Sequence, residues 1–191
     1  MRTAILDSLT AMIAEGCGLA HIPIERLAKH AGVSKTTIYK WWPGKEDIFC
    51  EAFFHWTDNH LPTLAFADHG AKNFYPQFLL RATEIRQFHR GAIARTMLGL
   101  TLEHDAIAHQ FQQKYQLPRY RAMQSSLQEW LGVEAKREDI SLFLDLTFSL
   151  IYNFSSPNIA QTDANLREEI TRVFQLIFPQ AKLQSLIDSS R

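Results

Sequence analysis

The stretch AGVSKTTIYKWWPGKEDI, residues 31–48, decides how this 191-residue chain is interpreted. It joins a glycine-containing turn to two threonines, a tyrosine, two adjacent tryptophans and three lysines. Between Arg26 and Lys45 there are five basic residues and no acidic one, although the whole chain carries twenty of each sign. A neutral chain therefore contains a local cationic segment, a pattern that can contact nucleic acid.

The spacing of the apolar residues predicts a helix-turn-helix at about residues 24–43. A first helix at 24–30 places small Ala28 where the two helices cross, and Gly32 supplies the positive φ that the turn needs. A second helix follows at about 35–41. In such a unit the second helix enters the major groove, with its N-terminal residues at the base edges.

The second helix would present polar side chains with enough reach for bases and phosphates: Ser34, Lys35, Thr36, Thr37 and Lys40. Two plainer interpretations stay open at this point. The same spacing occurs in ordinary helical hairpins, and a basic run is often only a solvated face.

Residues 31–48 closely resemble the signature of the TetR family of bacterial transcriptional regulators. That signature is an A-G-V-S turn, a threonine-rich recognition helix, a tyrosine, an aromatic residue three positions later, and a lysine followed by acidic and aliphatic residues. In this chain the later positions are Tyr39, Trp42, Lys45, Glu46, Asp47 and Ile48. The resemblance implies a homodimer that binds double-stranded DNA at a near-palindromic operator.

The resemblance also implies roles for single residues. Tyr39 and Lys45 take the positions of phosphate contacts, and Trp42 takes that of a buried aromatic residue. Trp41 has two interpretations, packing and DNA contact, of which packing is favoured. The candidate DNA-binding residues are therefore Ser34, Lys35, Thr36, Thr37, Tyr39, Lys40 and Lys45.

The chain departs from the family's pattern before the first helix of the motif. Members usually have serine or threonine there, capping the helix and touching phosphate, whereas this chain has Ile22 and Pro23. Proline suits a helix start but has no hydroxyl group and no amide proton to offer. The chain also has no long basic N-terminal arm, and only Arg2 could serve as one.

Helical periodicity dominates the chain and predicts an all-α fold of about nine helices. An N-terminal three-helix, helix-turn-helix DNA-binding domain is expected over 1–50, and a larger helical ligand-binding and dimerisation domain over 51–191. The stretch 61–70 is expected to be a boundary loop. Further helices are expected at about 3–15, from Lys45 onward, and at 72–88, 91–103, 105–131, 138–154 and 163–178.

Three local features refine these helices. Asp105 is expected to cap the helix at 105–131, and Pro118 to kink it, because proline removes a backbone donor. Thr162 or Asp163 is expected to cap the last helix.

The expected helix at 138–154 is apolar on nearly every side. Only Ser141, Asp145, Ser149 and Asn153 form a narrow polar strip along it. One interpretation is a central core helix. The other, favoured by the resemblance, is a four-helix bundle formed with a second subunit. The candidate interface residues are Phe143, Leu146, Leu150, Ile151, Phe154, Ile170, Val173, Phe174 and Ile177.

The helices between 72 and 131 would enclose a pocket for a small-molecule effector that is largely apolar. The candidate lining residues are Phe88, Met97, Phe111, Tyr115, Met123 and Trp130. The alternative is that these residues are plain core. The mechanism implied by the family is a repressor that a bound ligand releases from its operator.

Other function classes lack support in the sequence. Asp105, His109 and adjacent His104 make a weak metal site without a cysteine partner, so no metal and no cofactor are expected. Catalytic and phosphate-loop motifs are absent, and no apolar run reaches membrane-spanning length. Cys17 and Cys50 are expected to be reduced, buried thiols in a cytoplasmic protein. Two rivals remain, a ligand- or protein-binding module without specific DNA binding and a small all-α enzyme.

Overall fold

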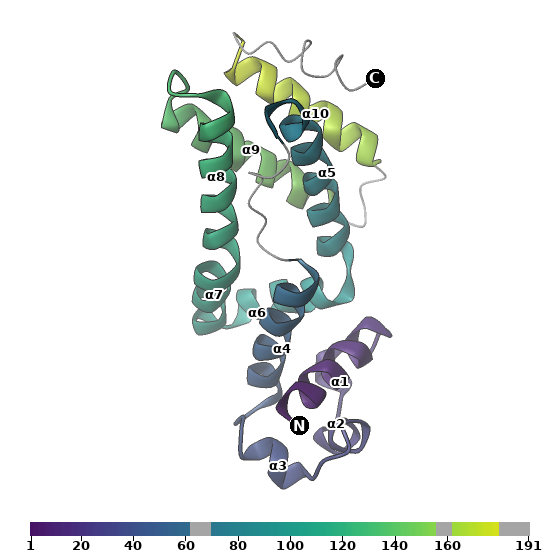
Figure 1. The fold of residues 1–191 in the computed structure, drawn as a ribbon. Helices are drawn as coiled ribbons and strands as arrows, with labels where there is room; N and C mark the ends of the chain where they lie inside the picture. The colour runs from purple at the N-terminus through teal and green to yellow at the C-terminus, as the bar shows by residue number, and fades with distance from the viewer. Residues whose placement is uncertain (62–69, 156–161, 180–191) are drawn as a thin grey trace. The chain divides into compact units, whose positions relative to one another are not determined.

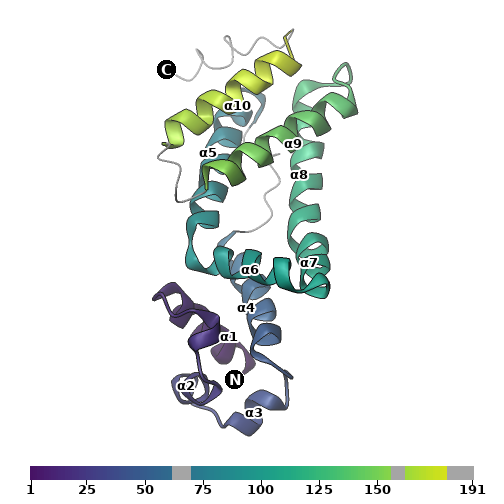
Figure 2. The ribbon, with the colours of Figure 1, turned by 180° about the vertical axis from the view of Figure 1, so that it is seen from behind.

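The structure is a computed structural model that describes residues 1–61, 70–155 and 162–179. All secondary structure in these ranges is helical, which confirms the predicted all-α class. Figures 1 and 2 show the helices from opposite sides. In chain order they are α1 (Arg2–Ala14), α2 (Ile24–His30), α3 (Lys35–Tyr39), α4 (Lys45–His60), α5 (Gly70–Arg90), α6 (Ala92–Glu103), α7 (Asp105–Phe111), α8 (Leu117–Leu131), α9 (Arg137–Phe154) and α10 (Asp163–Ile177). The expected boundary loop at 61–70 lies almost entirely outside the described residues.

The described helices form two compact units. The first combines Met1–Thr63 with Gly91–Leu117, so that α6 and α7 belong with α1 to α4. Its core is built on α1 and α4, which pack along each other and both contact α6. The apolar residues spaced three and four apart on α1 and α4 are fully buried there: Ile5, Leu9, Met12, Ile48, Phe49 and Phe53.

The second unit combines Leu64–Arg90 with Pro118–Arg191, and its core lies where α5, α9 and α10 meet. Aromatic rings dominate this core. The ring of Tyr75 lies 4.9 Å from that of Phe174 and 5.8 Å from that of Trp130, measured between centroids. None of the described helices is long and apolar enough to cross a membrane.

The recognition helix is shorter than predicted. It was expected to reach residue 41, but α3 ends at Tyr39, and Trp41 and Trp42 lie in the turn that follows. The amides of Trp41 and Trp42 both donate to the carbonyl oxygen of Ile38, which closes the helix with a turn, and Pro43 disfavours helical backbone at Trp42. The two tryptophans are therefore presented by a turn.

The single helix predicted at 105–131 is divided in two just before Pro118. Helix α7 ends at Phe111, a π-helical turn spans Gln112–Gln116, and α8 follows. The amide of Leu117 donates to the carbonyl oxygen of Gln112, five residues earlier. Pro118, the next residue, has no amide proton, so the helical hydrogen-bond pattern shifts where that donor is missing.

One of the two expected caps is confirmed. Thr162 caps α10 in a capping box, in which Asn165 donates its amide to the Thr162 hydroxyl oxygen at 3.2 Å and accepts the Thr162 amide at 3.1 Å. The expectation for Asp105 was wrong. His104 holds the N-cap position of α7 without a side-chain bond, and Asp105 is the first helical residue.

Candidate nucleic-acid interface

The helix-turn-helix is held together by a small apolar core and one glycine. Leu27 and Ile38 are fully buried, and Ala28 is nearly so. The amide of Val33 donates to the carbonyl oxygen of Ala28 at 2.9 Å across the turn. Gly32 has a φ of +67°, and a side chain there would meet no atom within 4 Å, so the turn requires glycine for its backbone angle.

Ser34 begins the recognition helix. Its hydroxyl oxygen accepts the amide of Thr37 at 3.1 Å, and the two hydroxyl groups lie 2.8 Å apart. This is an N-cap, which satisfies an amide that the first helical turn leaves unpaired. Ser34 and Thr37, both candidate DNA contacts, thus bond to each other in the free protein.

Most of the remaining candidates on α3 are exposed. Lys35, Thr36 and Lys40 lie at the surface, and the Tyr39 side chain is 57% exposed. These side chains therefore come from one short helix whose opposite side is buried through Ile38. Such a face can approach a DNA groove without rearrangement of the core.

Lys35 has an acidic partner that the sequence analysis missed. Its ammonium lies 2.8 Å from the carboxylate of Glu25 on α2, and both side chains are exposed. The hydrogen bond to Glu25 raises the pKa of Lys35, and the same bond lowers the pKa of Glu25. Glu25 lies one position before the segment Arg26–Lys45, which has no acidic residue. It is ten residues from Lys35, and helical spacing alone does not reveal a contact over that separation.

Lys45 is part of the scaffold as well as a candidate phosphate contact. Its ammonium donates to the carbonyl oxygens of Leu19 at 3.1 Å and Ala20 at 2.9 Å. These carbonyls belong to a 3-10 turn at Leu19–His21, so the bonds tie the start of α4 to the segment before α2. An ammonium group has three donors, and one remains for another acceptor.

The two tryptophans differ in burial. Trp42 is 4% exposed, which confirms the expected buried aromatic residue, and its indole nitrogen donates to the Glu51 carboxylate at 2.8 Å. Trp41 is 44% exposed. Pro23 is the N-cap of α2, where its carbonyl oxygen accepts the amides of Arg26 and Leu27, but no side-chain cap is made.

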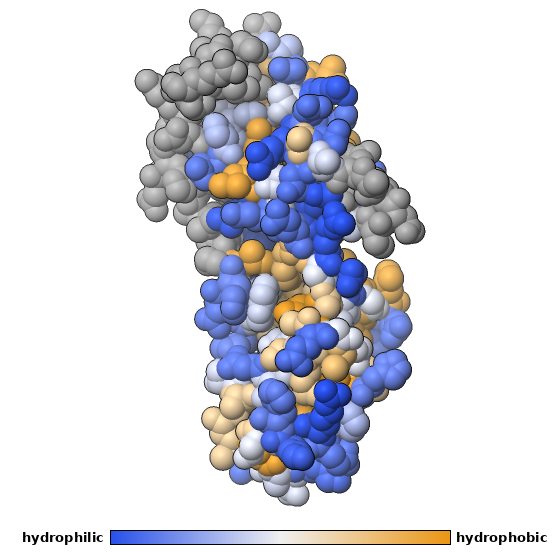
Figure 3. Space-filling view, turned by 90° about the vertical axis from the view of Figure 1, so that its right-hand side faces the viewer, coloured by the Kyte–Doolittle hydropathy of each residue, from blue (hydrophilic) through white to orange (hydrophobic). Residues whose placement is uncertain are grey.

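Arg2 does not extend from the protein as a basic arm but is bound to α4. Its guanidinium donates to the Glu51 carboxylate at 2.7 and 2.5 Å and lies over both tryptophan rings. On the face of this unit seen in Figure 3, hydrophilic and hydrophobic residues are interspersed.

The six candidate effector-lining residues divide between the two units. Phe111 and Tyr115 pack on Phe53 of α4, with ring centroids 5.7 and 5.3 Å away, and Met97 is fully buried in the same unit. Met123 and Trp130 belong to the core cluster of the C-terminal unit. Phe88 also lies in that unit, beside His89. The six therefore do not line one pocket within either unit.

Four of the nine candidate interface residues pack inside the single chain. Phe143, Ile151, Ile170 and Phe174 are fully buried there, where they form its core. The apolar pattern of α9 alone does not show which of its residues face inward, so a proposed interface depends on the residues that stay exposed. Leu146 is 41% exposed. Leu150, Val173 and Ile177 are half-buried, and the side chain of Phe154 lies outside the described residues.

Among the residues that the structure describes, no three His, Cys, Asp or Glu side chains gather as a metal site would require. Cys17 and Cys50 are both free thiols, and Cys50 is buried as expected, whereas Cys17 is only partly buried. Burial, together with the carboxylate of Asp47, raises the pKa of the Cys50 thiol to about 11.

Comparison with known proteins places the motif in a family. Residues 5–52 match the family described as bacterial regulatory proteins, tetR family. Over 189 residues the chain is 22% identical to the uncharacterized HTH-type transcriptional regulator YdeS of Bacillus subtilis strain 168, covering 96% of this chain and 92% of that protein.

Two solved structures share the fold. A TetR transcriptional regulator from Rhodococcus sp. RHA1 superposes with a TM-score of 0.55 at 18% identity, over 92% of each chain. The protein SCO7518 of Streptomyces coelicolor A3(2) gives a TM-score of 0.65 at 18% identity, over 90% of this chain and 96% of that one. The match of α1 to α4 to the family and the shared fold lead to one conclusion. Together they support a regulator of the TetR family, and the chain is a DNA-binding transcriptional regulator with a helix-turn-helix at α2 and α3.

Proposed function

We propose that the protein is a homodimeric cytoplasmic repressor that a small molecule releases from a near-palindromic operator. The observation that carries the proposal is the outer face of α3, where Lys35, Thr36, Tyr39 and Lys40 are exposed on a helix fixed from behind by Ile38. Lysine and tyrosine suit phosphate contacts, and threonine suits base edges. One such short helix covers few base pairs, so a second copy is needed for a specific site.

Exposed leucines support the dimer. Leu142 is 50% exposed and Leu146 is 41% exposed on α9, and they lie four residues apart, on the same face of the helix. Leu176 on α10 is 81% exposed. An exposed apolar face on two neighbouring helices favours association with a second copy through a four-helix bundle. The proposed interface therefore uses Leu142, Leu146 and Leu176, with half-buried Leu150, Val173 and Ile177 beside them.

Two buried polar atoms support an effector site in the C-terminal unit. His89 Nε2 and the Thr147 hydroxyl are buried and have no hydrogen-bond partner among the described residues. His89 Nδ1 lies 2.8 Å from the carbonyl oxygen of Ile85, which can only accept, so Nδ1 carries the proton. Burial lowers the pKa of His89, which keeps the ring neutral and leaves a lone pair on Nε2. An effector with an apolar body and one N–H or O–H donor would satisfy that atom.

The experiment that tests the function is a selection of bound fragments from the source genome at physiological salt. The DNA-face variant is Lys35→Ala with Lys40→Ala. The matched control is Lys136→Ala with Arg137→Ala, which removes the same charge from the exposed start of α9. We expect the native protein and the control to enrich the same near-palindrome, and the DNA-face variant to enrich none.

A ligand that stays bound during purification could hold the protein in a state that does not bind DNA. The native protein is therefore also refolded from denaturant, free of ligand, before the selection. If the refolded native protein still enriches no sequence, specific DNA binding by this chain is wrong, and the ligand- or protein-binding rival replaces it. If the DNA-face variant enriches the same sequence as well as the native protein does, α3 is not the reading helix.

A further inference from the structure

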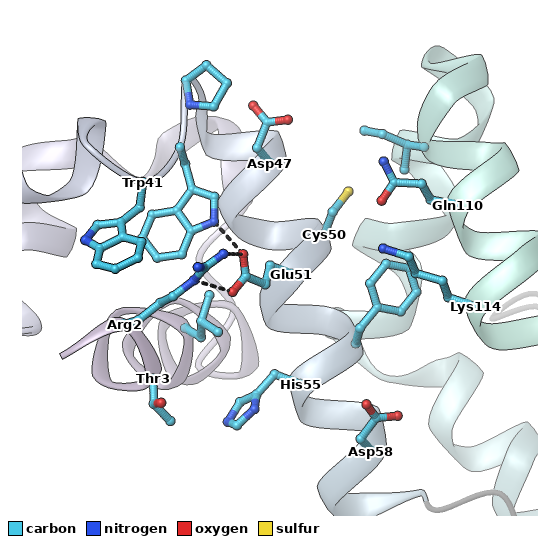
Figure 4. A pocket seen from close by; sticks show the side chains of 15 residues that line it. Arg2, Thr3, Trp41, Asp47, Cys50, Glu51, His55, Asp58, Gln110 and Lys114 are labelled. Carbon is cyan, nitrogen blue, oxygen red and sulfur yellow. Dashed lines mark hydrogen bonds and ion pairs between the residues drawn. The ribbon is translucent and has the colours of Figure 1, made fainter.

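A cavity of about 710 Å³ runs along one side of α4 within the N-terminal unit. Figure 4 shows its two walls. One wall is formed by the first turn of α1 and the turn between α3 and α4, and the other by α7 and the π-helical turn after it. All of its lining residues belong to the N-terminal unit, none of them is on α3, and the function proposed above does not use it.

The lining combines aromatic rings with carboxylates. Trp41, Trp42 and Phe54 supply three rings, and Asp47, Glu51 and Asp58 supply three carboxylates. Two cationic side chains, Arg2 and Lys114, also border it. Each of these cations lies over an aromatic ring. The Lys114 ammonium is 5.3 Å from the centroid of Phe54, and Arg2 lies over the two tryptophans. Aromatic faces beside carboxylates attract organic cations, and an anion would meet three like charges.

The side chain of Arg2 shows how a cation is bound there. Its guanidinium lies 5.0 Å from the Trp41 centroid and 5.3 Å from that of Trp42. Two of its nitrogens donate to the two Glu51 carboxylate oxygens, at 2.7 and 2.5 Å. Trp42 Nε1 donates to Glu51 at 2.8 Å and so fixes the carboxylate for the paired bond. The hydrogen bond from Arg2 lowers the pKa of Glu51, so its carboxylate is ionised at neutral pH.

Arg2 can be displaced from this site. It is the first residue of α1, and its side chain is 46% exposed. An ion pair this open to water contributes little to stability because solvent screens it. The carboxylate and the two rings, in contrast, are set on α4 and on the turn before it.

We propose that this cavity is a binding site for a small organic cation, of the guanidinium, amidinium or primary-ammonium class, which replaces Arg2 on Trp41, Trp42 and Glu51. Arg2 then acts as a tethered competitor that covers the site when no ligand is bound. Trp41 and Trp42 directly follow the recognition helix, so exchange of Arg2 for a free cation changes the support of that helix. The site is thereby linked to DNA binding without contacting DNA.

The test uses benzamidine, a planar aromatic amidinium, with benzoate as its anionic counterpart. Calorimetric titration compares the native protein, Arg2→Ala, and Arg2→Ala combined with Glu51→Gln. We expect Arg2→Ala to bind benzamidine about tenfold more tightly than the native protein, because the competitor is gone. Addition of Glu51→Gln should weaken that binding by tenfold or more, and benzoate should not bind.

Two results would overturn the proposal. One is the absence of saturable benzamidine binding to Arg2→Ala, and the other is equal affinity with and without the Glu51 carboxylate. Because Glu51→Gln also weakens the hydrogen bond that Trp42 donates at this position, by replacing a charged acceptor with a neutral one, Arg2→Ala with Trp41→Leu provides a second variant at an exposed position. This double variant should have the same helical circular dichroism as the native chain. It should nevertheless bind benzamidine several-fold more weakly than Arg2→Ala does. DNA binding by the native chain is measured in a separate experiment. A failure of the cation-binding test therefore does not affect the conclusion drawn from the operator selection.

Discussion

The ammonium of Lys35, at the first position of the recognition helix, lies 2.8 Å from the carboxylate of Glu25, at the second position of α2. A phosphate or a base edge that approaches Lys35 must therefore compete with an internal carboxylate. The same carboxylate repels phosphates nearby. Glu25 therefore weakens the attraction of phosphates to the proposed DNA-binding face of α3.

Glu25→Gln should raise affinity for the operator about twofold to fivefold, because the exposed pair is weak and its loss frees Lys35. The gain should be larger at low salt, where charges are less screened. Fluorescence anisotropy with labelled operator over a series of salt concentrations measures it. Glu134→Gln, an exposed change in the C-terminal unit, is the matched control. Unchanged or weaker binding by Glu25→Gln would show that Lys35 makes no contact with DNA.

Lys45→Met keeps the length of the side chain but removes its donors to Leu19 and Ala20. We expect the free energy of unfolding to fall by about 1–2 kcal/mol, since two charge-assisted bonds are lost. Urea unfolding followed by circular dichroism measures this. If the third donor of the ammonium reaches a phosphate, the salt slope of DNA binding should also fall by about 1. A stability equal to that of the native protein would remove the scaffold role.

Leu142→Glu with Leu146→Glu should convert a dimer into a monomer. Both side chains are at least two-fifths exposed, so the charges meet water in the monomer but would be buried in the interface. Sedimentation velocity at micromolar concentration gives the oligomeric state. Val133→Glu, at a side chain that is 95% exposed, controls for an added acid. A stable dimer of the double variant would place the interface on another surface.

The buried imidazole of His89 should make stability depend on pH. Burial lowers the pKa of His89 below its ordinary value of 6.5, so the unfolded chain binds a proton that the folded chain excludes. This contribution to stability is complete above pH 6.5 and declines as the pH falls toward the lowered pKa. His89→Gln should flatten the decline in melting temperature below pH 6.5, whereas His30→Gln, at an exposed position, should not. Parallel curves for the native protein and His89→Gln would contradict the burial argument.

Local sequence rules predicted the motif well. The helix at 24–30, the glycine turn and the buried Trp42 follow from short-range spacing and from the family signature, and all are present in the structure. The capping box at Thr162 is equally local. These features depend on residues within a few positions of one another, which a single sequence displays directly.

Features set by tertiary packing were not predictable in the same way. The bond from Lys45 to Ala20 joins residues 25 positions apart, and nothing in the pattern of either segment marks it. In α9, Leu146 and Ile151 are equally apolar, yet one is exposed and the other fully buried. The polar strip of α9 marks one outward side, but periodicity does not say how far the buried surface extends around the helix from it, because that depends on which neighbouring helices cover it.

The N-terminal unit is discontinuous along the chain, since α6 and α7 complete a body that begins with α1 to α4. A chimera that grafted only residues 1–60, which hold α1 to α4, onto the C-terminal half of another regulator would leave Phe53 without the rings of Phe111 and Tyr115. The part of the chain that must be transferred as one piece is therefore larger than the helix-turn-helix. Recombination between relatives would preserve function only if the crossover points kept α4 together with the segment from Gly91 to Leu117.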